Sequence, residues 1–456
     1  MGSDFGGGCP LSSAPNPLEL PGVPPTLWSV LRAAAGGERI ALVGGAVRDW
    51  LLHHQHLDPW RGLVDLDLVI EEGKGEAEGE GALDPTRPAR PSPAWRFVER
   101  IAAATDQVTV RDARPHGRYG TVELELELLP PSLDGGPTPA PMRLLLDVAS
   151  ARGETYPTPA DNPVVFFGAL EDDLARRDLT INAMAMDLTT GALLDPHGGQ
   201  GDLALRRLCF LHPASLRDDP TRLVRAARYA ARLGFPLAAE SESQALSTLA
   251  SWPWVWRPGD PPPRAPAALG TRLRREMELL LERENWRIAL DRLQAWGGLV
   301  LLDAALQADR RWPRRLHWAR RLGVPRIVAL IAVAPDPLAL AERLQLPHRH
   351  HRLLEAFSHL RQALARETGG AGGGAGTAWS WCQRLEAPGG SPEAVALALA
   401  CGLGPRRPLL RWLLRWRHLR SERSAEELMA AGVPRGPELG DALRRCRQER
   451  LNQERP

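Results

Sequence analysis

Apolar residues recur along this chain at two different spacings. In the front part, an apolar run before a Gly-Gly pair and a stretch of strict alternation are typical of strands. Strands are expected at 40–43, 63–70, 107–111, 120–129 and 143–149, with helices at 26–35, 46–52 and 95–104. From Leu174 onward, helical spacing dominates. The pattern therefore predicts an α+β protein, in which a small mixed-sheet head is followed by an all-helical remainder.

Several segments lack either spacing and are expected to lie outside the packed elements. Residues 1–24 resemble a flexible tail, and residues 71–93, rich in Gly, Glu and Pro, resemble a disordered insertion. Residues 152–170 are interpreted as a Pro-containing loop, and 253–268 as a Pro-rich linker. Because 456 residues exceed the size of one compact core, two to four domains are expected.

Composition excludes several classes of protein. No stretch of 18 apolar residues occurs, so a membrane span is not expected. The five cysteines are scattered and form no CxxC pair, which predicts neither a zinc site nor a disulfide framework and favours a cytoplasmic location. Residues 401–456 contain 13 arginines against 7 acidic residues. Such a charge suits contact with a phosphate backbone, although a solvated arginine-rich surface would carry the same charge.

Two aspartates stand in the alternating strand at 63–70. Because residues i and i+2 of a strand point to the same face, the carboxylates of Asp65 and Asp67 project together among apolar neighbours. Paired carboxylates repel each other unless a cation lies between them, and Mg²⁺ binds through one or two carboxylates together with substrate phosphates. The pair therefore predicts a Mg²⁺ site, although a lone DxD motif is weak evidence.

A Gly-Gly turn precedes these aspartates. Gly44 and Gly45 end a strand and open a helix, a place where backbone N–H groups approach a phosphate closely. Arg48 adds positive charge there, or pairs with Asp49 or another carboxylate of the head. An ordinary tight turn between strand and helix is the alternative interpretation.

A third polar segment follows the expected sheet. Arg176, Arg177 and Asp178 are adjacent, and Asn182 follows within five residues of Arg177, a grouping that suits triphosphate and ribose contacts at a helix start. A solvated basic turn would have the same composition.

The fourth polar segment carries an aspartate and an arginine on one helix face. Asp219 and Arg222 are three residues apart, so they share that face. Aspartate only accepts hydrogen bonds and arginine only donates them. Cytosine and adenine present an exocyclic amine beside an unprotonated ring nitrogen, whereas uracil and guanine present a carbonyl beside a ring N–H. The pair therefore matches C and A, although helix capping with an intrahelical ion pair explains the same spacing.

Together these segments resemble the bacterial tRNA nucleotidyltransferase/poly(A) polymerase family, the class of the CCA-adding enzymes. The matching stretches are LVGGAVRD at 42–49, DLDLVIE at 65–71, LDVASARGETYP at 146–157, LEDDLARRDLTINAMAMD at 170–187, LLDPHGGQGDL at 193–203, LRDDPTRLVRAARYAARLGF at 216–235 and ELMAAGVPRGPELGDAL at 427–443. The resemblance implies a nucleotidyltransferase head at 25–205, a helical neck for base recognition at 206–290, a helical body at 291–385 and a tRNA-binding tail at 386–456.

The resemblance also implies roles for individual residues. Two Mg²⁺ ions would be bound by Asp65 and Asp67, with Asp147 as a third acidic group nearby. The residues expected at the triphosphate and ribose are Gly44, Gly45, Arg48, Arg177, Asp178 and Asn182. The residues expected to choose between CTP and ATP are Asp219 and Arg222, supported by Arg225 and Arg228.

The implied reaction is template-independent addition of C, A or both to the 3′ end of tRNA, with release of pyrophosphate. Full CCA addition, CC-only addition, A-only addition and poly(A) synthesis stay open within the family, and a noncatalytic RNA-binding protein is the alternative outside it. Four tryptophans of the rear half, Trp379, Trp381, Trp412 and Trp416, can stack on bases, but their helical spacing favours core packing.

Overall fold

The computed structural model describes residues 19–62, 66–72, 92–104, 108–116, 120–128, 141–261, 264–368, 376–387 and 389–454. The chain divides into two compact units, Met1–Pro253 and Trp254–Pro456. The four-part division into head, neck, body and tail is finer than this and stays a prediction. Within the described residues, no helix is both long enough and apolar enough to cross a membrane.

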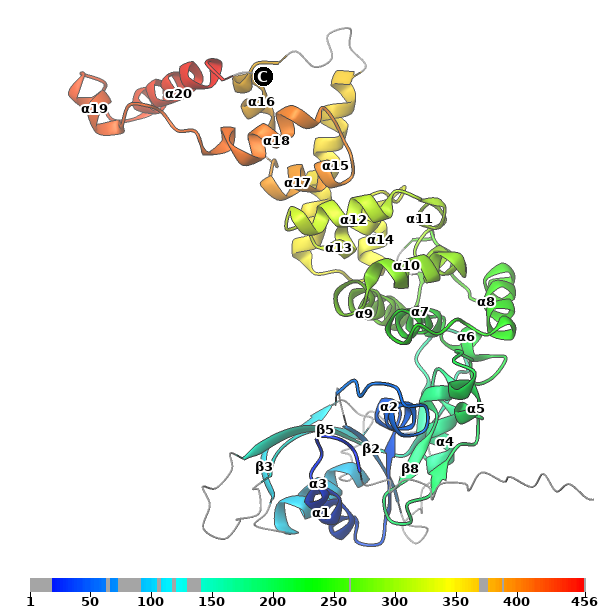
Figure 1. The fold of residues 1–456 in the computed structure, drawn as a ribbon. Helices are drawn as coiled ribbons and strands as arrows, with labels where there is room; N and C mark the ends of the chain where they lie inside the picture. The colour runs from blue at the N-terminus through cyan, green and yellow to red at the C-terminus, as the bar shows by residue number, and fades with distance from the viewer. Residues whose placement is uncertain are drawn as a thin grey trace, which may run out of the picture. The chain divides into compact units, whose positions relative to one another are not determined.

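The first unit contains all the named strands (Figure 1). Its strands are β1 (Arg39–Val43), β2 (Leu66–Glu71), β3 (Val108–His116), β4 (Thr121–Leu128), β5 (Met142–Ser150), β6 (Arg152–Thr155), β7 (Val164–Phe167), β8 (Ala185–Asp187) and β9 (Leu193–Leu194). Its helices are α1 (Pro25–Ala35), α2 (Gly45–His54), α3 (Pro93–Ala104), α4 (Leu170–Ala175), the 3₁₀ turn η2 (Thr180–Asn182), α5 (Gly199–Ala204), α6 (Ser215–Asp218), α7 (Thr221–Leu233) and α8 (Ala239–Ser251).

Seven of these strands form one mixed sheet in the order β3-β4-β5-β2-β1-β8-β9. Only β2 and β5 pair in parallel; the other neighbours are antiparallel. Alternate residues such as Leu124, Leu126 and Val148 are buried on the face that α1 and α3 cover. On the opposite face, Ala41, Val43 and Val69 pack against α4, through its residues Leu170 and Leu174. Alternation thus gives β4 one apolar side for the helix layer, whereas the continuous apolar run of β1 is buried on both faces.

Within the described residues, the expected strands of the sheet and the helices α1, α2 and α3 are confirmed with shifts of a few residues at their ends; residues 63–65, 107 and 129 of the expected strands lie outside the described residues. The expected loop at 152–170 is wrong in part, because β6 and β7 form an antiparallel hairpin in which Arg152 pairs with Phe167. Strands β8 and β9 were also not expected. All four are too short to show a hydrophobic period, so tertiary pairing decides their conformation.

The expected tail at 1–24 and the expected insertion at 71–93 lie largely outside the described residues, which omit 1–18 and 73–91. At the edge of the first, Leu20 and Val23 are buried, so the packed chain begins before residue 25. At the edges of the second, β2 continues through Glu71 and α3 begins at Pro93.

The described part of the second unit is helical. Its helices are α9 (Ala267–Arg283), α10 (Trp286–Ala295), η4 (Gly298–Leu301), α11 (Ala304–Ala308), α12 (Trp312–Arg321), α13 (Arg326–Ile331), α14 (Pro337–Arg343), α15 (His348–Thr368), α16 (Ala378–Leu385), α17 (Pro392–Ala400), α18 (Arg406–Leu414), η5 (Trp416–His418), α19 (Ala425–Ala430) and α20 (Pro437–Asn452). The fold class expected from the sequence is confirmed: a mixed-sheet head followed by helices.

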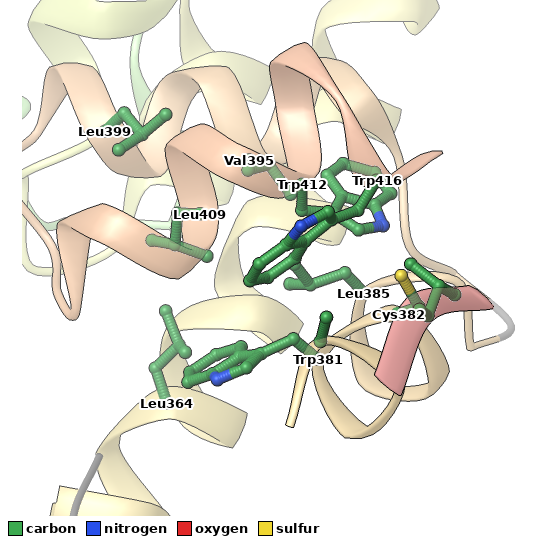
Figure 2. Packing of buried hydrophobic residues seen from close by; sticks show 11 residues of the cluster. Leu364, Trp381, Cys382, Leu385, Val395, Leu399, Leu409, Trp412 and Trp416 are labelled. Carbon is green, nitrogen blue, oxygen red and sulfur yellow. The ribbon is translucent and has the colours of Figure 1, made fainter. Parts of the chain in front are cut away.

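Tryptophans form the centre of the rear helices (Figure 2). Trp381, Trp412 and Trp416 are buried together with Leu385 and Leu409. Trp379 is partly buried against the same cluster. Core packing of these side chains, favoured from their spacing, is therefore confirmed.

Candidate active site

The Gly-Gly turn lies between two polar side chains of the first unit. Gly44 follows β1 with φ 70° and ψ −130°, a left-handed conformation that a side chain would strain, and α2 begins at Gly45. A Cβ placed on Gly44 would lie 2.9 Å from Nη1 of Arg177 and 3.5 Å from Oδ2 of Asp67. The turn thus brings together three of the residues singled out in the sequence.

Acidic side chains form a row on the same side of the sheet as Asp67. Asp67 pairs with Asp147 across the parallel strands β2 and β5, and Asp147 pairs with Glu123 of β4. Directly paired residues point to one face, so the three carboxylates are neighbours there. Asp65 lies outside the described residues, and within the described chain no group of three or more His, Cys, Asp or Glu side chains, this row included, has the arrangement of a metal site.

The donor set of this row fits Mg²⁺. The ion prefers carboxylate oxygens and is bound by one or two of them together with substrate phosphates. Asp67 and Asp147 supply two such carboxylates, and the Gly44 turn lies beside Asp67.

Four other residues expected at the site are joined by consecutive hydrogen bonds. Arg48 of α2 donates through Nη1 to Oδ1 of Asn182 at 2.7 Å. Asn182 donates through Nδ2 to Oδ1 of Asp178 at 3.2 Å. Arg225 of α7 donates through Nε to Oδ2 of Asp178 at 2.7 Å. This chain of bonds connects α2, η2 and α7, and it places Asp178 and Asn182, both buried, among protein partners.

Burial and pairing act in opposite directions on the charges of this network. Burial by itself raises the pKa of Asp178, but the charge and hydrogen bond of Arg225 and the hydrogen bond from Asn182 outweigh it, so the pKa lies below the ordinary value. Burial likewise lowers the pKa of Arg48, but pairing with Asp49 more than compensates and raises it. The guanidinium of Arg48 also lies 5.3 Å from the ring centre of Tyr229. Both groups are therefore charged at neutral pH.

The two adjacent arginines share one carboxylate that the sequence analysis missed. Asp173 of α4 accepts from Nη2 of Arg176 at 2.6 Å and from Nη2 of Arg177 at 2.9 Å. Its side chain is completely buried. The sequence does contain a signal for these ion pairs. Asp173 precedes the arginines by three and four residues, and residues at these spacings are neighbours on a helical turn.

Arg222 lies in the first turn of α7, whereas Asp219 precedes the helix in an extended conformation, so the shared helix face expected from their spacing is not formed. Oδ1 of Asp219 accepts from the backbone N–H of Thr221 at 3.0 Å and from its hydroxyl at 2.7 Å, which is the capping contact foreseen as an alternative. The buried guanidinium of Arg222 donates through Nη2 to the carbonyl of Arg176 at 2.8 Å. Arg228 lies on the same helix, half-buried, one turn after Arg225.

A histidine not foreseen from the sequence faces Arg222. Nε2 of His212 lies 3.4 Å from Nη1 of Arg222. Burial and the charge of Arg222 both lower the pKa of His212, so the imidazole is neutral at pH 7 and accepts from the guanidinium. Burial raises the pKa of the neighbouring Asp218.

The second unit has a basic cavity of its own, with a volume of about 860 Å³. The basic residues that line it are Arg417, His418, Arg420, Arg423, Arg444 and Arg447. Glu386, also in the lining, accepts from both terminal nitrogens of Arg447 at 2.7 Å. Apart from Leu385, the lining of the cavity lies within 386–456, the segment for which RNA binding is expected.

Known proteins match this chain in sequence. The family model of the poly A polymerase head domain matches residues 139–209. A CC-adding tRNA nucleotidyltransferase of Deinococcus radiodurans is 34% identical over 337 residues, which are 71% of this chain and 71% of the relative. An A-adding tRNA nucleotidyltransferase of Geobacter sulfurreducens is 27% identical over 439 residues, which are 90% of this chain but only 43% of the relative. This chain therefore spans less than half the length of the second relative.

Solved structures match the fold. The apo form of a CCA-adding enzyme has a TM-score of 0.64 at 22% identity and covers 95% of this chain and 94% of its own. The Thermotoga maritima CCA-adding enzyme complexed with tRNA has a TM-score of 0.59 at 21% identity and covers 95% and 93%. These likenesses support the architecture, and the extent and identity of the Deinococcus match decide the family. The chain belongs to the bacterial tRNA nucleotidyltransferase/poly(A) polymerase family, a family of enzymes.

Proposed function

We propose that this protein adds C, A or both from CTP and ATP to the 3′ end of tRNA without a nucleic-acid template. The observation that carries the proposal is the convergence at Gly44, where the Asp67 carboxylate and the Arg177 guanidinium flank a Gly-Gly turn. A metal-binding carboxylate beside a phosphate-binding turn is what nucleotidyl transfer from a triphosphate requires. Relatives named CC-adding and A-adding tRNA nucleotidyltransferases support tRNA 3′ ends as the substrate.

In the proposed reaction, the 3′-hydroxyl of the RNA attacks the α-phosphorus of the triphosphate. The bond to the bridging oxygen of the β-phosphate breaks, and pyrophosphate leaves. Asp67 and Asp147, together with Asp65, would hold two Mg²⁺ ions. These ions would supply a lowered pKa for the attacking hydroxyl and neutralisation of the charge on the leaving phosphates.

The triphosphate would lie against the start of α2. The first backbone N–H groups of a helix have no intrahelical partner, and the helix dipole favours an anion there. Gly44 and Gly45 add no side chain of their own at this end, and Arg177 adds a positive charge beside it. Arg48, Asp178 and Asn182 would support the site from behind, through the hydrogen bonds that join them.

The base would be read at the start of α7. Asp219 would accept from the exocyclic amine of C or A, and Arg222 would donate to the adjacent ring nitrogen. Arg225 and Arg228, on the same helix, would keep its register by contacts such as the ion pair of Arg225 with Asp178. In the second unit, the arginines of the basic cavity would contact RNA phosphates and so hold the tRNA.

The test is extension of tRNA transcripts by the purified full chain with Mg²⁺ and one labelled triphosphate at a time. Transcripts that end before the CCA sequence, after the first C or after the second C distinguish full CCA, CC-only and A-only addition. Long products with ATP alone would indicate poly(A) synthesis. Binding of tRNA without extension of any transcript would contradict the proposal and favour a noncatalytic RNA-binding protein. Incorporation of U or G as readily as C or A would contradict the role of Asp219 and Arg222.

A further inference from the structure

We infer that Asp173 is a positioning residue, which holds both the arginine beside the Gly44 turn and the segment that fixes the base-reading Arg222. The inference rests on the proposed function, because it concerns how that site is assembled. It is carried by the geometry around one carboxylate of α4 that lies outside the residues expected to touch the substrate.

Each oxygen of Asp173 holds a different guanidinium. Oδ1 accepts from Nε and Nη2 of Arg176 at 3.0 and 2.6 Å. Oδ2 accepts from Nε and Nη2 of Arg177 at 3.2 and 2.9 Å. With four N–H groups bound to one carboxylate, neither planar guanidinium can rotate without breaking two charge-assisted hydrogen bonds.

The contacts of Arg177 connect Asp173 with the Gly44 turn. The edge of Arg177 bound to Asp173 is the one formed by Nε and Nη2, so Nη1 points away from the carboxylate. Nη1 donates to the carbonyl of Asn182 at 3.4 Å and lies 2.9 Å from the position of a Cβ on Gly44. Asp173 thereby fixes where the charge of Arg177 lies relative to Gly44 and Asp67.

The contacts of Arg176 connect Asp173 with Arg222, the arginine proposed to bind the base. The side chain of Arg176 is held by Asp173 and, through Nη1, by Glu154 of β6 at 3.3 Å. The carbonyl of the same residue accepts from Nη2 of Arg222 at 2.8 Å. A shift of the Arg176 backbone therefore moves the acceptor that orients Arg222.

Two carboxylates offset the charges of the two arginines, because Arg176 pairs with both Asp173 and Glu154 while Arg177 pairs with Asp173. Burial raises the pKa of Asp173, but the two arginines outweigh it and lower the pKa, so the carboxylate stays ionised at working pH. Without that negative charge, two adjacent guanidinium groups would repel each other and separate.

The test compares Asp173→Asn with a control, Asp187→Asn, in the same unit. Asparagine keeps the shape of Asp173 but turns an N–H donor toward one of the arginines. We expect the KM for CTP and ATP to rise about 10- to 100-fold, because misplaced contacts cost factors of this size. The KM for tRNA should stay within about two-fold, and incorporation of U or G relative to C and A should increase. Asp173→Glu, which keeps the charge, should restore part of the loss.

Asp187 is a matched control because it is also buried and also paired with an arginine, Arg39, away from the turn. Asp187→Asn should lower the Tm without changing the KM for either triphosphate. If Asp173→Asn lowers the Tm but leaves triphosphate KM and base choice at wild-type values, the inference is overturned. If Asp173→Asn does not fold, Arg176→Gln serves instead. This substitution removes only the side-chain contacts that hold the Arg176 backbone in place. It should weaken the choice between bases more than the affinity for triphosphates. An unchanged choice between bases would overturn the inference.

Equilibrium binding of labelled CTP and ATP, with Mg²⁺ and without RNA, separates this inference from the proposed function. Wild-type protein that binds the triphosphates but does not extend tRNA would contradict the proposed function only. In that case, weaker binding by Asp173→Asn would still support the inference. Equal binding by Asp173→Asn and wild type, or no binding by the wild type, would overturn it.

Discussion

Two regions of the molecule, one in each unit, bury chemically different side chains. Beside the sheet of the first unit, Arg48, Asp173, Asp178 and Asn182 are buried and bonded to one another or to arginines. In the rear helices of the second unit, the centre is apolar and contains Trp381, Trp412 and Trp416 (Figure 2).

Buried charges are costly unless they are paired, whereas buried tryptophans stabilise a fold directly. A region that buries several charges in one connected network therefore gains little stability from them. Its benefit is the fixed placement of groups such as Arg177 and Arg222. The comparison predicts that substitutions in the polar network mainly change activity and that substitutions in the tryptophan cluster mainly change stability.

The largest effect is expected for Asp67→Ala. Loss of this carboxylate removes a metal ligand next to the Gly44 turn, and nucleotide addition should fall by at least about 10³-fold. The Tm should change little, because the side chain of Asp67 is not buried in the core. Single-turnover extension of tRNA measures the rate. Glu125→Ala is the control and should retain activity. Glu125 lies on the same face of β4 as Glu123 and pairs with Arg143. Full activity of Asp67→Ala would remove the metal-site assignment.

Trp416→Ala, in contrast to Asp67→Ala, should lower the stability and leave triphosphate binding intact. Truncating a fully buried tryptophan leaves a cavity and should lower the free energy of unfolding by about 3–5 kcal/mol. Triphosphate binding should be retained at temperatures where the chain is folded. Denaturant unfolding followed by circular dichroism measures the loss. Trp379→Ala, at a partly buried position, should cost less. A Trp416→Ala protein of wild-type stability that bound tRNA poorly would revive the stacking interpretation.

Asp178→Asn should lower both the activity and the stability to a moderate degree. It breaks the ion pair with Arg225, which is itself 35% exposed, so a loss of about 2 kcal/mol is expected, below the value for a fully buried pair. The pKa of Asp178 is lower in the folded protein than in the unfolded chain. The stability difference from wild type should therefore be complete above about pH 4 and disappear as the pH falls through the folded pKa. Urea unfolding at several pH values tests this. A difference that grew toward acid would contradict the pairing, and Glu422→Gln, at an exposed site, should show no such dependence.

The smallest effect is expected for Arg420→Ala in the basic cavity. One lost phosphate contact should weaken tRNA binding by a few-fold, equally for all sequences, and reduce the slope of log affinity against log salt by about 1. Filter binding at several salt concentrations measures both. Arg366→Ala, an exposed arginine of α15 outside the cavity, is the control. An unchanged salt slope for Arg420→Ala would exclude this cavity as a phosphate contact.

Much of the fold was predictable because its signals are local. The alternation at 63–70 and 120–129 and the helical spacing after Leu174 follow from the backbone periods of strand and helix, and the matching elements were found. The hairpin β6–β7 was missed because four residues per strand carry no period. The Gly-Gly turn was predictable for a similar reason, since Gly44 adopts a conformation that favours glycine.

The sequence by itself thus predicted the fold class, the family and the longer strands of the sheet, and it singled out polar residues for the proposed site. The tertiary structure decided which of these residues meet. Asp67 and Asp147 are neighbours only because β5 pairs in parallel with β2, and Arg48 reaches Asn182 across 134 residues of chain. The role of Asp173 was hidden for the same reason, since its two arginines are local but their targets, Gly44 and Arg222, are not. Periodicity is set by the geometry of the backbone, whereas contacts between distant segments depend on sheet order and packing, which no short stretch of sequence encodes.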